Sequence, residues 1–442
     1  MNKNTYSTID LSALRSAQMG VTMDISQLLK IVKHAYNTVP FYRELKKQMK
    51  TVNSEISGIE EFKNLPFVDK DMVQKNHELL LSDDYLTYPN NSRLSIRRTS
   101  GSTGKYLRIY WDYKYNIKSL LELWYCRKKF YNIHPHDKYC YFYTTDYRAN
   151  KLIDEPEMII AGDKKSIGFS KNDLNEEKLL KIYNSMYEFN PIYIMIQPSM
   201  AILLMECMER NNKPCFVDLR YIELTGEMLI NSVRDKLEIF FGCPVCNQYG
   251  CNEANSIACE HGDRNLYVNT SNVYVEIVKD GKCVSEGEYG DIYITSLTNY
   301  AMPFIRYKIG DQGKLIYKDN KQILELVTGR TAYFVIDREK NRLPSYIFLR
   351  PIEHINEQIG VVIYQFQVVQ NDIDDFEVYL SLAPTYAGWK KTIEELFISN
   401  IKQETIKTAN WKFTYKERLY PDNVTGKLTY FFSKIDGGIY GY

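Results

Sequence analysis

The chain has no long apolar run, almost no net charge and no secretion signal. Its 442 residues include 56 Lys and Arg against 55 Asp and Glu, a formal net charge of +1, so nothing draws the whole molecule towards nucleic acid or an anionic membrane. No stretch of about 18 apolar residues is present, which argues against a membrane span. The N-terminal segment lacks the apolar core and the small-residue cleavage site of a signal peptide. We therefore expect a cytoplasmic protein that has no membrane span and does not bind nucleic acid.

Several common catalytic and cofactor-binding motifs are also missing. The nine cysteines are an odd number scattered through a large chain, which predicts reduced thiols rather than a disulfide framework. We find no G-x-G-x-x-G dinucleotide fingerprint and no Ser-His-Asp arrangement. The segment TSGSTGK at 99–105 is not a Walker A loop, because only two residues separate its glycines and Tyr106 follows its lysine. The chain thus shows no sign of a P-loop nucleotidase, a dinucleotide-dependent enzyme or a serine hydrolase.

The pattern of apolar residues predicts an α/β fold in two domains. Residues 26–36 form one amphipathic helical pattern, and from residue 139 onwards short apolar or aromatic runs alternate with helical ones. Such alternation implies crossover units and a largely parallel sheet. After residue 264, short runs broken by glycine turns resemble an antiparallel or barrel-like subdomain. We predict a large N-terminal domain over 1–329, with mostly parallel sheets and the barrel-like subdomain, and a small α+β domain over 330–442.

The segment 99–105 is the first candidate for binding an anion. Its glycines leave backbone N–H groups unobstructed among several hydroxyls, which suits an anion-binding nest. On its own, the pattern is a weak signal and is more typical of an ordinary polar turn. The residues concerned are Thr99, Ser100, Gly101, Ser102, Thr103, Gly104 and Lys105.

Other motifs in the chain favour the interpretation of this segment as a phosphate-binding loop. YGCNE at 249–253, RYKIGD at 306–311, GR at 329–330 and TGK at 425–427 follow TSGSTGK in an order and spacing that resemble the adenylate-forming enzymes, the acyl-CoA synthetase and adenylation-domain superfamily. The ending GKLTYFFSKI looks closer to relatives among capsule and surface-polysaccharide biosynthesis proteins. Further segments resemble the phenylacetate-CoA ligase branch, so the resemblance covers nearly the whole chain. They are LLKIVKHAYNTVPFYREL at 28–45, LPFVDKDMVQ at 65–74, QPSMAILL at 197–204 and FFGCPV at 240–245.

The resemblance implies that the protein is an AMP-forming carboxylate ligase. In that reaction a small carboxylic acid, for which this branch suggests an aromatic one, attacks the α-phosphate of ATP to give an acyl-adenylate and pyrophosphate. The enzyme must hold a triphosphate and neutralise the charge that grows on its oxygens. The resemblance assigns 99–105 to the β- and γ-phosphates and Glu253 to Mg²⁺, which prefers carboxylate and phosphate oxygens. Segments 141–147 and 197–200 are candidates for lining the acyl pocket.

The nucleotide sugar and base have their own candidates. Asp311 can accept hydrogen bonds from both ribose hydroxyls, and the resemblance implies that Arg330 lies in the same sugar and phosphate region. Without the surrounding motifs, the two residues would be interpreted as a buried salt bridge. Tyr249, followed by Gly250, would offer an aromatic face near the adenine and acyl pocket, although a core tyrosine at a strand end fits the residue pattern too.

Two further candidates are expected at turns. Thr225, Gly226 and Glu227 resemble the family's adenine-contacting turn, but a plain helix start with an acidic first turn explains them equally well. Lys427 follows a glycine near the end of the chain, where a lysine is usually a solvated charge. The resemblance instead implies that Lys427 lies on a mobile lid and that its ammonium reaches the carboxylate and α-phosphate as the transition state forms.

Two departures from the family pattern leave the acyl acceptor open. Thr331 follows Arg330 where the family usually has an acidic residue or lysine, and KNRLPS at 340–345 has no glycine in a turn that borders the path of the thiol. Transfer of the acyl group to CoA is one alternative, and transfer to an amine, which would make an amide-forming ligase, is another. A third is a degenerate nucleotide-binding scaffold, against which Glu253 and Lys427 argue. The sequence carries no signal for an oligomeric state.

A group of cysteines with one histidine raises the question of zinc. Cys243 and Cys246 form the Cys-x-x-Cys expected for half of a structural site, which Cys259 and His261 could complete. Against this, the first two cysteines lie in an apparent buried strand, where they would face opposite ways, and buried thiols often behave as small hydrophobes. Some relatives carry a metal in this region. We therefore retain Cys251, Cys259 and His261 as a zinc candidate.

Overall fold

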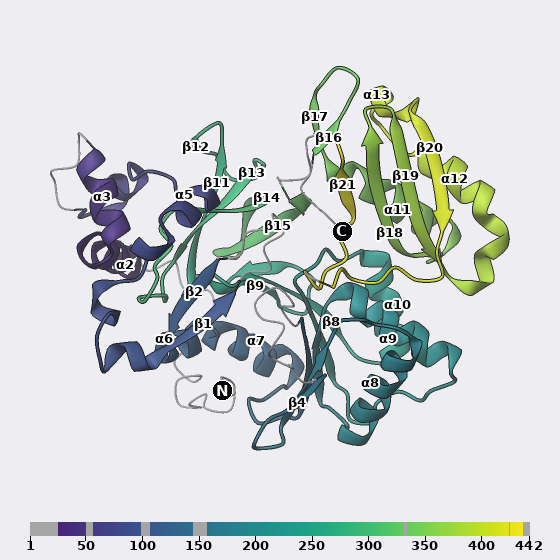
Figure 1. The fold of residues 1–442 in the computed structure, drawn as a ribbon, viewed down its shortest axis with the longest axis horizontal. Helices are drawn as coiled ribbons and strands as arrows, with labels where there is room; N and C mark the ends of the chain where they lie inside the picture. The colour runs from purple at the N-terminus through teal and green to yellow at the C-terminus, as the bar shows by residue number, and fades with distance from the viewer. Residues whose placement is uncertain are drawn as a thin grey trace. The chain divides into compact units, whose positions relative to one another are not determined.

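The computed structural model divides into two compact units (Figure 1). Unit 1 comprises Met1–Pro135 and Gln248–Val327, and unit 2 comprises His136–Asn247 and Thr328–Tyr442. Within the described residues, no helix is long and apolar enough to cross a membrane. The structure describes residues 25–49, 56–98, 107–144, 157–330, 334–423 and 425–435, and of residues 98, 328–330 and 387 it describes the backbone only.

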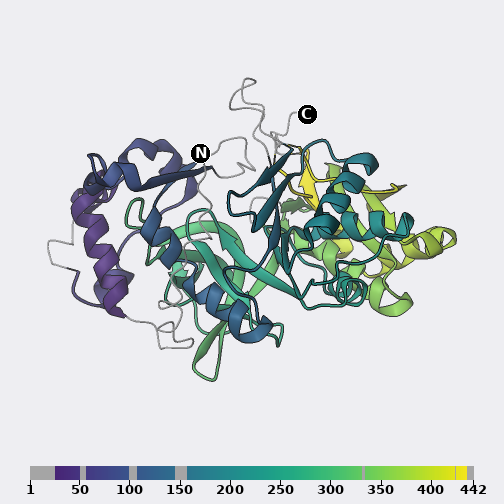
Figure 2. The ribbon, with the colours of Figure 1, turned by 90° about the horizontal axis from the view of Figure 1, so that it is seen from below.

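Unit 1 begins with two consecutive helices, α2 (Ile25–Thr38) and α3 (Pro40–Gln48), which contact each other and are joined by Val39 alone (Figure 2). Pro40 stands at the first position of α3, where its missing N–H leaves no hydrogen bond unmade. Leu28, Ile31 and Val32 are fully buried on one face of α2, which confirms the helix predicted over 26–36. The other helices are α4 (Ile59–Lys63), α5 (Lys70–Lys75), α6 (Tyr113–Lys118), α7 (Leu121–Tyr131) and the 3-10 turns η1 (His77–Leu79), η2 (Asp83–Tyr85) and η3 (Asn90–Arg93).

The rest of unit 1 is antiparallel sheet. β1 (Leu94–Arg98) pairs with β2 (Arg108–Asp112), and a larger sheet has the strand order β12-β11-β13-β14-β15-β10-β9-β8. The pairings of β11 with β12 and β13, and of β13 with β14, are antiparallel, as the glycine-broken runs after residue 264 predicted. β9 also pairs antiparallel with β8 and β10. The strands are β8 (Val245–Cys251), β9 (Asn255–Glu260), β10 (Leu266–Val268), β11 (Val273–Lys279), β12 (Lys282–Cys283), β13 (Gly290–Ser296), β14 (Tyr307–Lys318) and β15 (Lys321–Arg330).

Unit 2 contains the predicted parallel strands. β3 pairs in parallel with β5 and β6, β6 pairs in parallel with β7, and β4 adds an antiparallel edge to β5. Helices α8, α9 and α10 lie along one face of these strands (Figure 1). The elements are β3 (Tyr139–Tyr143), β4 (Met158–Ile160), β5 (Ser166–Ser170), β6 (Tyr193–Ile196), β7 (Tyr221–Thr225), α8 (Glu176–Phe189), α9 (Pro198–Arg210) and α10 (Asn231–Phe241).

Parallel strands end at a common edge of their sheet, where ligands of α/β proteins usually bind. In unit 2 this carboxyl edge is formed by the residues that directly follow each strand. They are Thr144 after β3, Lys171 after β5, Gln197 after β6 and Gly226 after β7.

The C-terminal part of unit 2 is a small α+β assembly. A four-stranded sheet has the order β20-β19-β18-β21, and helices α11 and α12 lie beside it (Figure 1). The elements are β16 (Phe334–Ile336), β17 (Arg342–Pro344), η4 (Ser345–Phe348), α11 (Leu349–Ile359), β18 (Ile363–Asp372), β19 (Asp375–Leu382), η5 (Pro384–Trp389), α12 (Lys390–Ser399), α13 (Glu404–Lys407), β20 (Asn410–Tyr415) and β21 (Phe431–Ser433).

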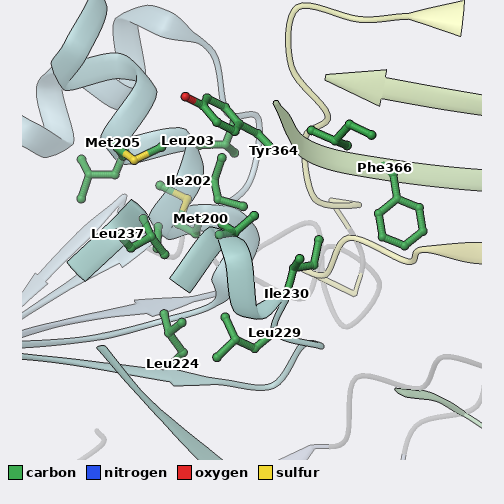
Figure 3. Packing of buried hydrophobic residues seen from close by; sticks show 14 of the residues in the cluster. Met200, Ile202, Leu203, Met205, Leu224, Leu229, Ile230, Leu237, Tyr364 and Phe366 are labelled. Carbon is green, nitrogen blue, oxygen red and sulfur yellow. The ribbon is translucent and has the colours of Figure 1, made fainter. Parts of the chain in front are cut away.

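One hydrophobic cluster runs through all of unit 2. Figure 3 shows Met200 and Leu203 of α9 packed near Leu237 of α10, with Tyr364 and Phe366 of β18 in the same cluster. Segments from before and after residue 330 therefore share one core. Every residue of α9 from Pro198 to Met208 is buried, so this helix is packed against neighbouring elements on several sides. The α/β fold class is confirmed. The division into a mobile lid over 330–442 stays a prediction, although unit 2 resumes at Thr328, next to that boundary.

Candidate active site

In unit 1, the predicted ribose-binding residue is bonded to the predicted aromatic one. The hydroxyl of Tyr249 in β8 donates to Oδ2 of Asp311 in β14, at 2.7 Å. Hydrogen bonds to an ionised carboxylate are short and strong, so this contact fixes the orientation of the Asp311 side chain. Arg330 ends β15, and its side chain lies outside the described part of the chain. The alternative of a buried salt bridge between Asp311 and Arg330 is therefore untested.

Gly250, next to Tyr249, is required by the hairpin of β8 and β9. A Cβ at this position would lie 2.0 Å from the carbonyl oxygen of Asn255, closer than any real contact. The pairing of the two strands also shifts in register between Tyr249 and Gly250. The glycine of the YGCNE motif therefore lets two backbones approach each other, and this approach holds Tyr249 at the end of its strand.

The same hairpin carries Glu253, the candidate for Mg²⁺. Its side chain is buried, and Oε1 accepts a hydrogen bond from the Tyr307 hydroxyl at 3.3 Å. Tyr307 begins β14, the strand that also carries Asp311, so the hairpin and β14 bring the unit 1 candidates together. A carboxylate has about four lone-pair positions, so Glu253 keeps capacity for a hard cation beside its bonds with Tyr307 and the Cys251 thiol. The donor chemistry of Glu253 fits Mg²⁺.

The predicted phosphate-binding residues Thr99, Ser100, Gly101, Ser102, Thr103, Gly104 and Lys105 lie outside the described residues. The flanking strands β1 and β2 pair antiparallel in unit 1, with Arg98 opposite Arg108. The role of this segment stays a prediction.

In unit 2, Thr225, Gly226 and Glu227 lie at the carboxyl edge. Gly226 has φ 82°, a conformation that favours glycine. Oε2 of Glu227 accepts from the backbone N–H of Ser199, and Oε1 accepts from the Ser199 hydroxyl, each at 2.9 Å. Since α10 begins only at Asn231 and has no acidic residue in its first turn, the alternative interpretation of Glu227 as an acid in that turn is wrong. Its carboxylate instead bonds the first turn of α9.

The same turn holds the backbone next to Lys427. The N–H of Leu428 donates to Oε1 of Glu227 at 3.0 Å. Cε of Lys427 lies 4.0 Å from where a Cβ on Gly226 would stand. The structure therefore brings the predicted catalytic lysine beside the predicted adenine-contacting turn, although about 200 residues of sequence separate them.

Gly426, in the TGK motif, is the residue at which this loop approaches Thr144. It has φ 63°, and an added Cβ would lie 1.7 Å from Oγ1 of Thr144 at the end of β3. The loop is also closed on itself, because the Gly426 N–H donates to the Asp422 carbonyl at 2.7 Å and the Asp422 N–H donates to the Lys427 carbonyl at 3.0 Å. A glycine is needed here both for its backbone conformation and for space.

Two more residues lie at the carboxyl edge: the motif analysis missed Lys171 and included Gln197 only as a candidate for lining the acyl pocket. Lys171 is 4% exposed and donates from Nζ to the Gly426 carbonyl. Its burial lowers the pKa of the ammonium to about 8, against the opposing effect of the Glu227 charge. Oε1 of Gln197 is buried without a hydrogen-bond partner among the described residues. The signal that could have found Lys171 is its position directly after a parallel strand, since no residue motif surrounds it.

The zinc candidates need a correction. Among the described residues, the group whose ligand atoms lie within 4.8 Å of one another is Cys126, Cys259 and His261, and it does not include Cys251. Cys251 pairs with Asn255, four residues before Cys259 on β9, so the two cysteines are about 13 Å apart along the strand. The pKa of the Cys251 thiol is raised by burial and by the charge of Glu253, which also disfavours a thiolate ligand.

His261 packs between two aromatic rings in this cluster. It stacks on Tyr267 at a centroid distance of 4.0 Å and on Phe130 at 4.9 Å. Burial lowers the pKa of its imidazole to about 3, so the ring is neutral at ordinary pH. A neutral imidazole is the form that binds metals, but stacking in an aromatic core explains its position as well. The thiol of Cys126 donates to the Glu260 carbonyl at 3.0 Å.

The comparisons with known proteins agree with this architecture. No family model matches the chain. The chain is 23% identical over 361 residues to Protein CapK from Staphylococcus aureus, covering 78% of this chain and 74% of the relative. It is 23% identical over 403 residues to a phenylacetate-coenzyme A ligase from Thermus thermophilus, covering 86% of this chain and 83% of the relative. A crystal structure of 2-hydroxyisobutyryl-CoA ligase in the postadenylation state matches with a TM-score of 0.72 at 15% identity, over 93% of this chain and 89% of that one.

These similarities confirm the resemblance drawn from the motifs. The chain resembles the adenylate-forming enzymes, in the phenylacetate-CoA ligase-like branch and close to CapK, over most of its length. The mixed α/β fold is the fold of an acyl-CoA ligase.

Proposed function

We propose that this protein is an AMP-forming ligase that activates a carboxylic acid with ATP and then transfers the acyl group to CoA. The observation that carries the proposal is the position of Lys427 beside the Thr225–Glu227 turn at the carboxyl edge. In the first step a carboxylate oxygen attacks the α-phosphorus, the bond to the β-phosphate oxygen breaks, and pyrophosphate leaves. In the second step the CoA thiol loses its proton and attacks the acyl carbon, and AMP leaves.

The described residues have complementary parts in this reaction. Asp311, whose side chain is held by the Tyr249 hydroxyl, accepts hydrogen bonds from the ribose hydroxyls, and the aromatic face of Tyr249 contacts the base. The ammonium of Lys427 stabilises the charge that develops between carboxylate and α-phosphate, as a point charge on a flexible stem can. Gln197, whose buried Oε1 has no hydrogen-bond partner among the described residues, is a candidate to bind the substrate. Glu253 would hold Mg²⁺, which supplies neutralisation of the phosphate charge when it is bound.

The test is the exchange of labelled pyrophosphate into ATP across a panel of small carboxylic acids, aromatic acids included, because this exchange reports the first step whatever the acceptor. We expect exchange with at least one acid. Lys427→Ala should lower its rate roughly 100-fold or more and leave the KM for ATP nearly unchanged, since the lost contact forms in the transition state.

Lys434→Ala is the matched control. Lys434 is an exposed lysine seven positions further along, whose Nζ donates to Asn371 at 2.8 Å, and its loss should leave exchange unchanged. Exchange by Lys427→Ala within about tenfold of the wild type would contradict the assignment of Lys427. Silence of the wild type across the whole panel would favour the nucleotide-binding scaffold.

An amine acceptor is the second candidate. The turn at 340–345, which has no glycine, contains Lys340 at φ 62°, in the region of backbone conformation that favours glycine. A changed turn beside the thiol path would suit a different nucleophile. Incubation of the enzyme with ATP, the activated acid and either CoA or a set of amines distinguishes the two, because a thioester and an amide differ in product mass.

A structural zinc is a separate proposal. It rests on the cluster of Cys126, Cys259 and His261, which offers three of the four sulfur and nitrogen ligands of a structural zinc site. Elemental analysis of the purified protein tests it, and about one zinc per chain is the expected result. Zinc far below one per chain would leave the cluster as packed thiols and a stacked imidazole.

A further inference from the structure

Lys171 is the one lysine that the described contacts place against the backbone of the Lys427 loop. Nζ of Lys171 donates to the carbonyl oxygen of Gly426, the residue directly before Lys427. A Cβ on Gly426 would lie 3.0 Å from the same Nζ, so the loop and the lysine are in close contact. Because Lys171 is 4% exposed, little water competes for its ammonium.

The two residues after Lys171 attach the same loop at a second point. Nδ2 of Asn172 donates to the Asn423 carbonyl at 2.8 Å. The backbone N–H of Asp173 donates to Oδ1 of Asn423, and Nδ2 of Asn423 donates to Oδ1 of Asp173, each at 2.9 Å. Residues 171–173, which follow β5, therefore form several hydrogen bonds with the loop. A chance contact of one flexible side chain would provide only one.

The loop is held from both sides. Lys171 bonds the carbonyl of Gly426, and Glu227 bonds the N–H of Leu428 from the end of β7. Lys427 lies between these two fixed backbone groups, so the start of its side chain can move little while both bonds are made. A catalytic charge needs such fixing, because misplacement by about 1 Å can cost two orders of magnitude in rate.

We propose that Lys171 is a positioning residue: it fixes the backbone before Lys427 at the carboxyl edge so that the Lys427 ammonium meets the reacting groups. The proposal rests on the proposed function of Lys427. It gives Lys171 no contact with the substrate, and its effect on the reaction passes through Lys427.

The charge state of Lys171 predicts how activity and stability depend on pH. Burial favours the neutral amine and lowers the pKa of Lys171 to about 8, so the positioning charge is present below that pH and is lost above it. The folded protein then binds fewer protons than the unfolded chain between about pH 8 and the ordinary lysine pKa, so this group makes stability rise with pH in that window. Activity and stability thus move in opposite directions. The charged groups of the adjoining elements are Glu227 after β7, Asp422 and Lys427 on the loop, Asp173 beside Lys171, and Lys178 on α8.

The experiment compares four variants in pyrophosphate exchange: Lys171→Met, Lys427→Ala, the double variant, and Lys138→Met as a matched control. Lys138 also donates to a backbone carbonyl in unit 2, that of Phe189, at 3.2 Å. We expect Lys171→Met to lower kcat about 10- to 100-fold with the KM for ATP within about threefold, because only positioning is lost. The double variant should be no slower than Lys427→Ala, and Lys138→Met should match the wild type.

The pH profile adds an independent readout. The wild-type rate should fall as pH rises through about 8, without a matching fall in thermal stability, and this fall should be absent from Lys171→Met. If Lys171→Met does not fold, Lys171→Gln keeps a neutral donor of similar length and is used in its place.

Multiplying losses in the double variant would overturn the proposal, because independent effects add in free energy. An unchanged kcat in Lys171→Met would overturn it too. If the wild type shows no exchange with any acid, the proposed function fails instead. Hydrogen exchange of residues 425–430 then tests the contact alone: faster exchange in Lys171→Met supports it, and equal exchange in the two proteins refutes it.

Discussion

Gly426→Ala tests how closely the Lys427 loop packs against Thr144, an effect that must be distinguished from the backbone strain of a residue with positive φ. At φ 63°, any residue with a Cβ is strained by about 1–2 kcal/mol. The added Cβ would also lie 1.7 Å from Oγ1 and 2.9 Å from Cβ of Thr144, and rotation of the Thr144 side chain would relieve only the first of these contacts. Overpacking of this kind typically costs a further 1–3 kcal/mol.

A second glycine of the chain provides the matched control. Gly242 follows α10 and has φ 67°, but a Cβ there would meet nothing within 4 Å. Gly242→Ala therefore carries the backbone strain without the clash. The difference between the two variants isolates the close contact, and 1–3 kcal/mol corresponds to a loss of about 5- to 150-fold in the equilibrium constant for docking of the loop.

The assays are urea unfolding and pyrophosphate exchange. If the loop stays docked in Gly426→Ala, the free energy of unfolding should fall further than in Gly242→Ala. If the loop leaves instead, exchange should fall by up to about 150-fold while Gly242→Ala keeps the wild-type rate. Equal stability and equal exchange in the two variants would refute the contact between Gly426 and Thr144.

Two further predictions concern buried charges. Burial raises the pKa of Glu206 to about 7, so the folded protein binds more protons than the unfolded chain between about pH 4.5 and 7 and loses stability as pH rises through that window. Glu206→Gln should remove this loss: in urea unfolding, the variant should gain at most about 3 kcal/mol of stability on the wild type at pH 8 relative to pH 5. A gain that does not depend on pH would contradict the prediction. Arg306→Met should lower the free energy of unfolding by about 3–5 kcal/mol, because it leaves Glu276 buried and unpaired, and a loss below about 1 kcal/mol would argue against that ion pair.

The RYKIGD motif illustrates how a motif mixes structure with chemistry. Its Arg306 is 2% exposed, pairs with Glu276 at 2.8 Å, and donates to the carbonyl of Leu65 in the N-terminal part of unit 1. Its last residue, Asp311, contacts Tyr249 instead. The sequence pattern points to the motif as a whole, but only the contacts show that the arginine stabilises unit 1 while the aspartate is the candidate ligand.

Local patterns predicted the helix α2 and the parallel strands that the structure shows, while the roles of the candidate residues stay predictions. The 3.6-residue period over 26–36 predicted α2, and strands alternating with helices predicted the parallel sheet, because both features depend on near neighbours in the chain. The motifs pointed to Tyr249, Asp311 and Lys427. The segment 99–105 and the hinge after Arg330 stay predictions, since the structure does not describe those side chains.

The amino-acid order by itself determined the periodicities, the turn glycines and the motif residues, since each depends on the chemistry of residues a few positions apart. The tertiary structure decided which distant residues meet: Lys171 with Gly426, Glu227 with Leu428, and Cys126 rather than Cys251 with Cys259. The physical reason is that strand ends gather wherever parallel pairing puts them. A buried lysine after one strand can therefore bond a loop some 250 residues away, and nothing in its own surroundings in the sequence reveals that partner.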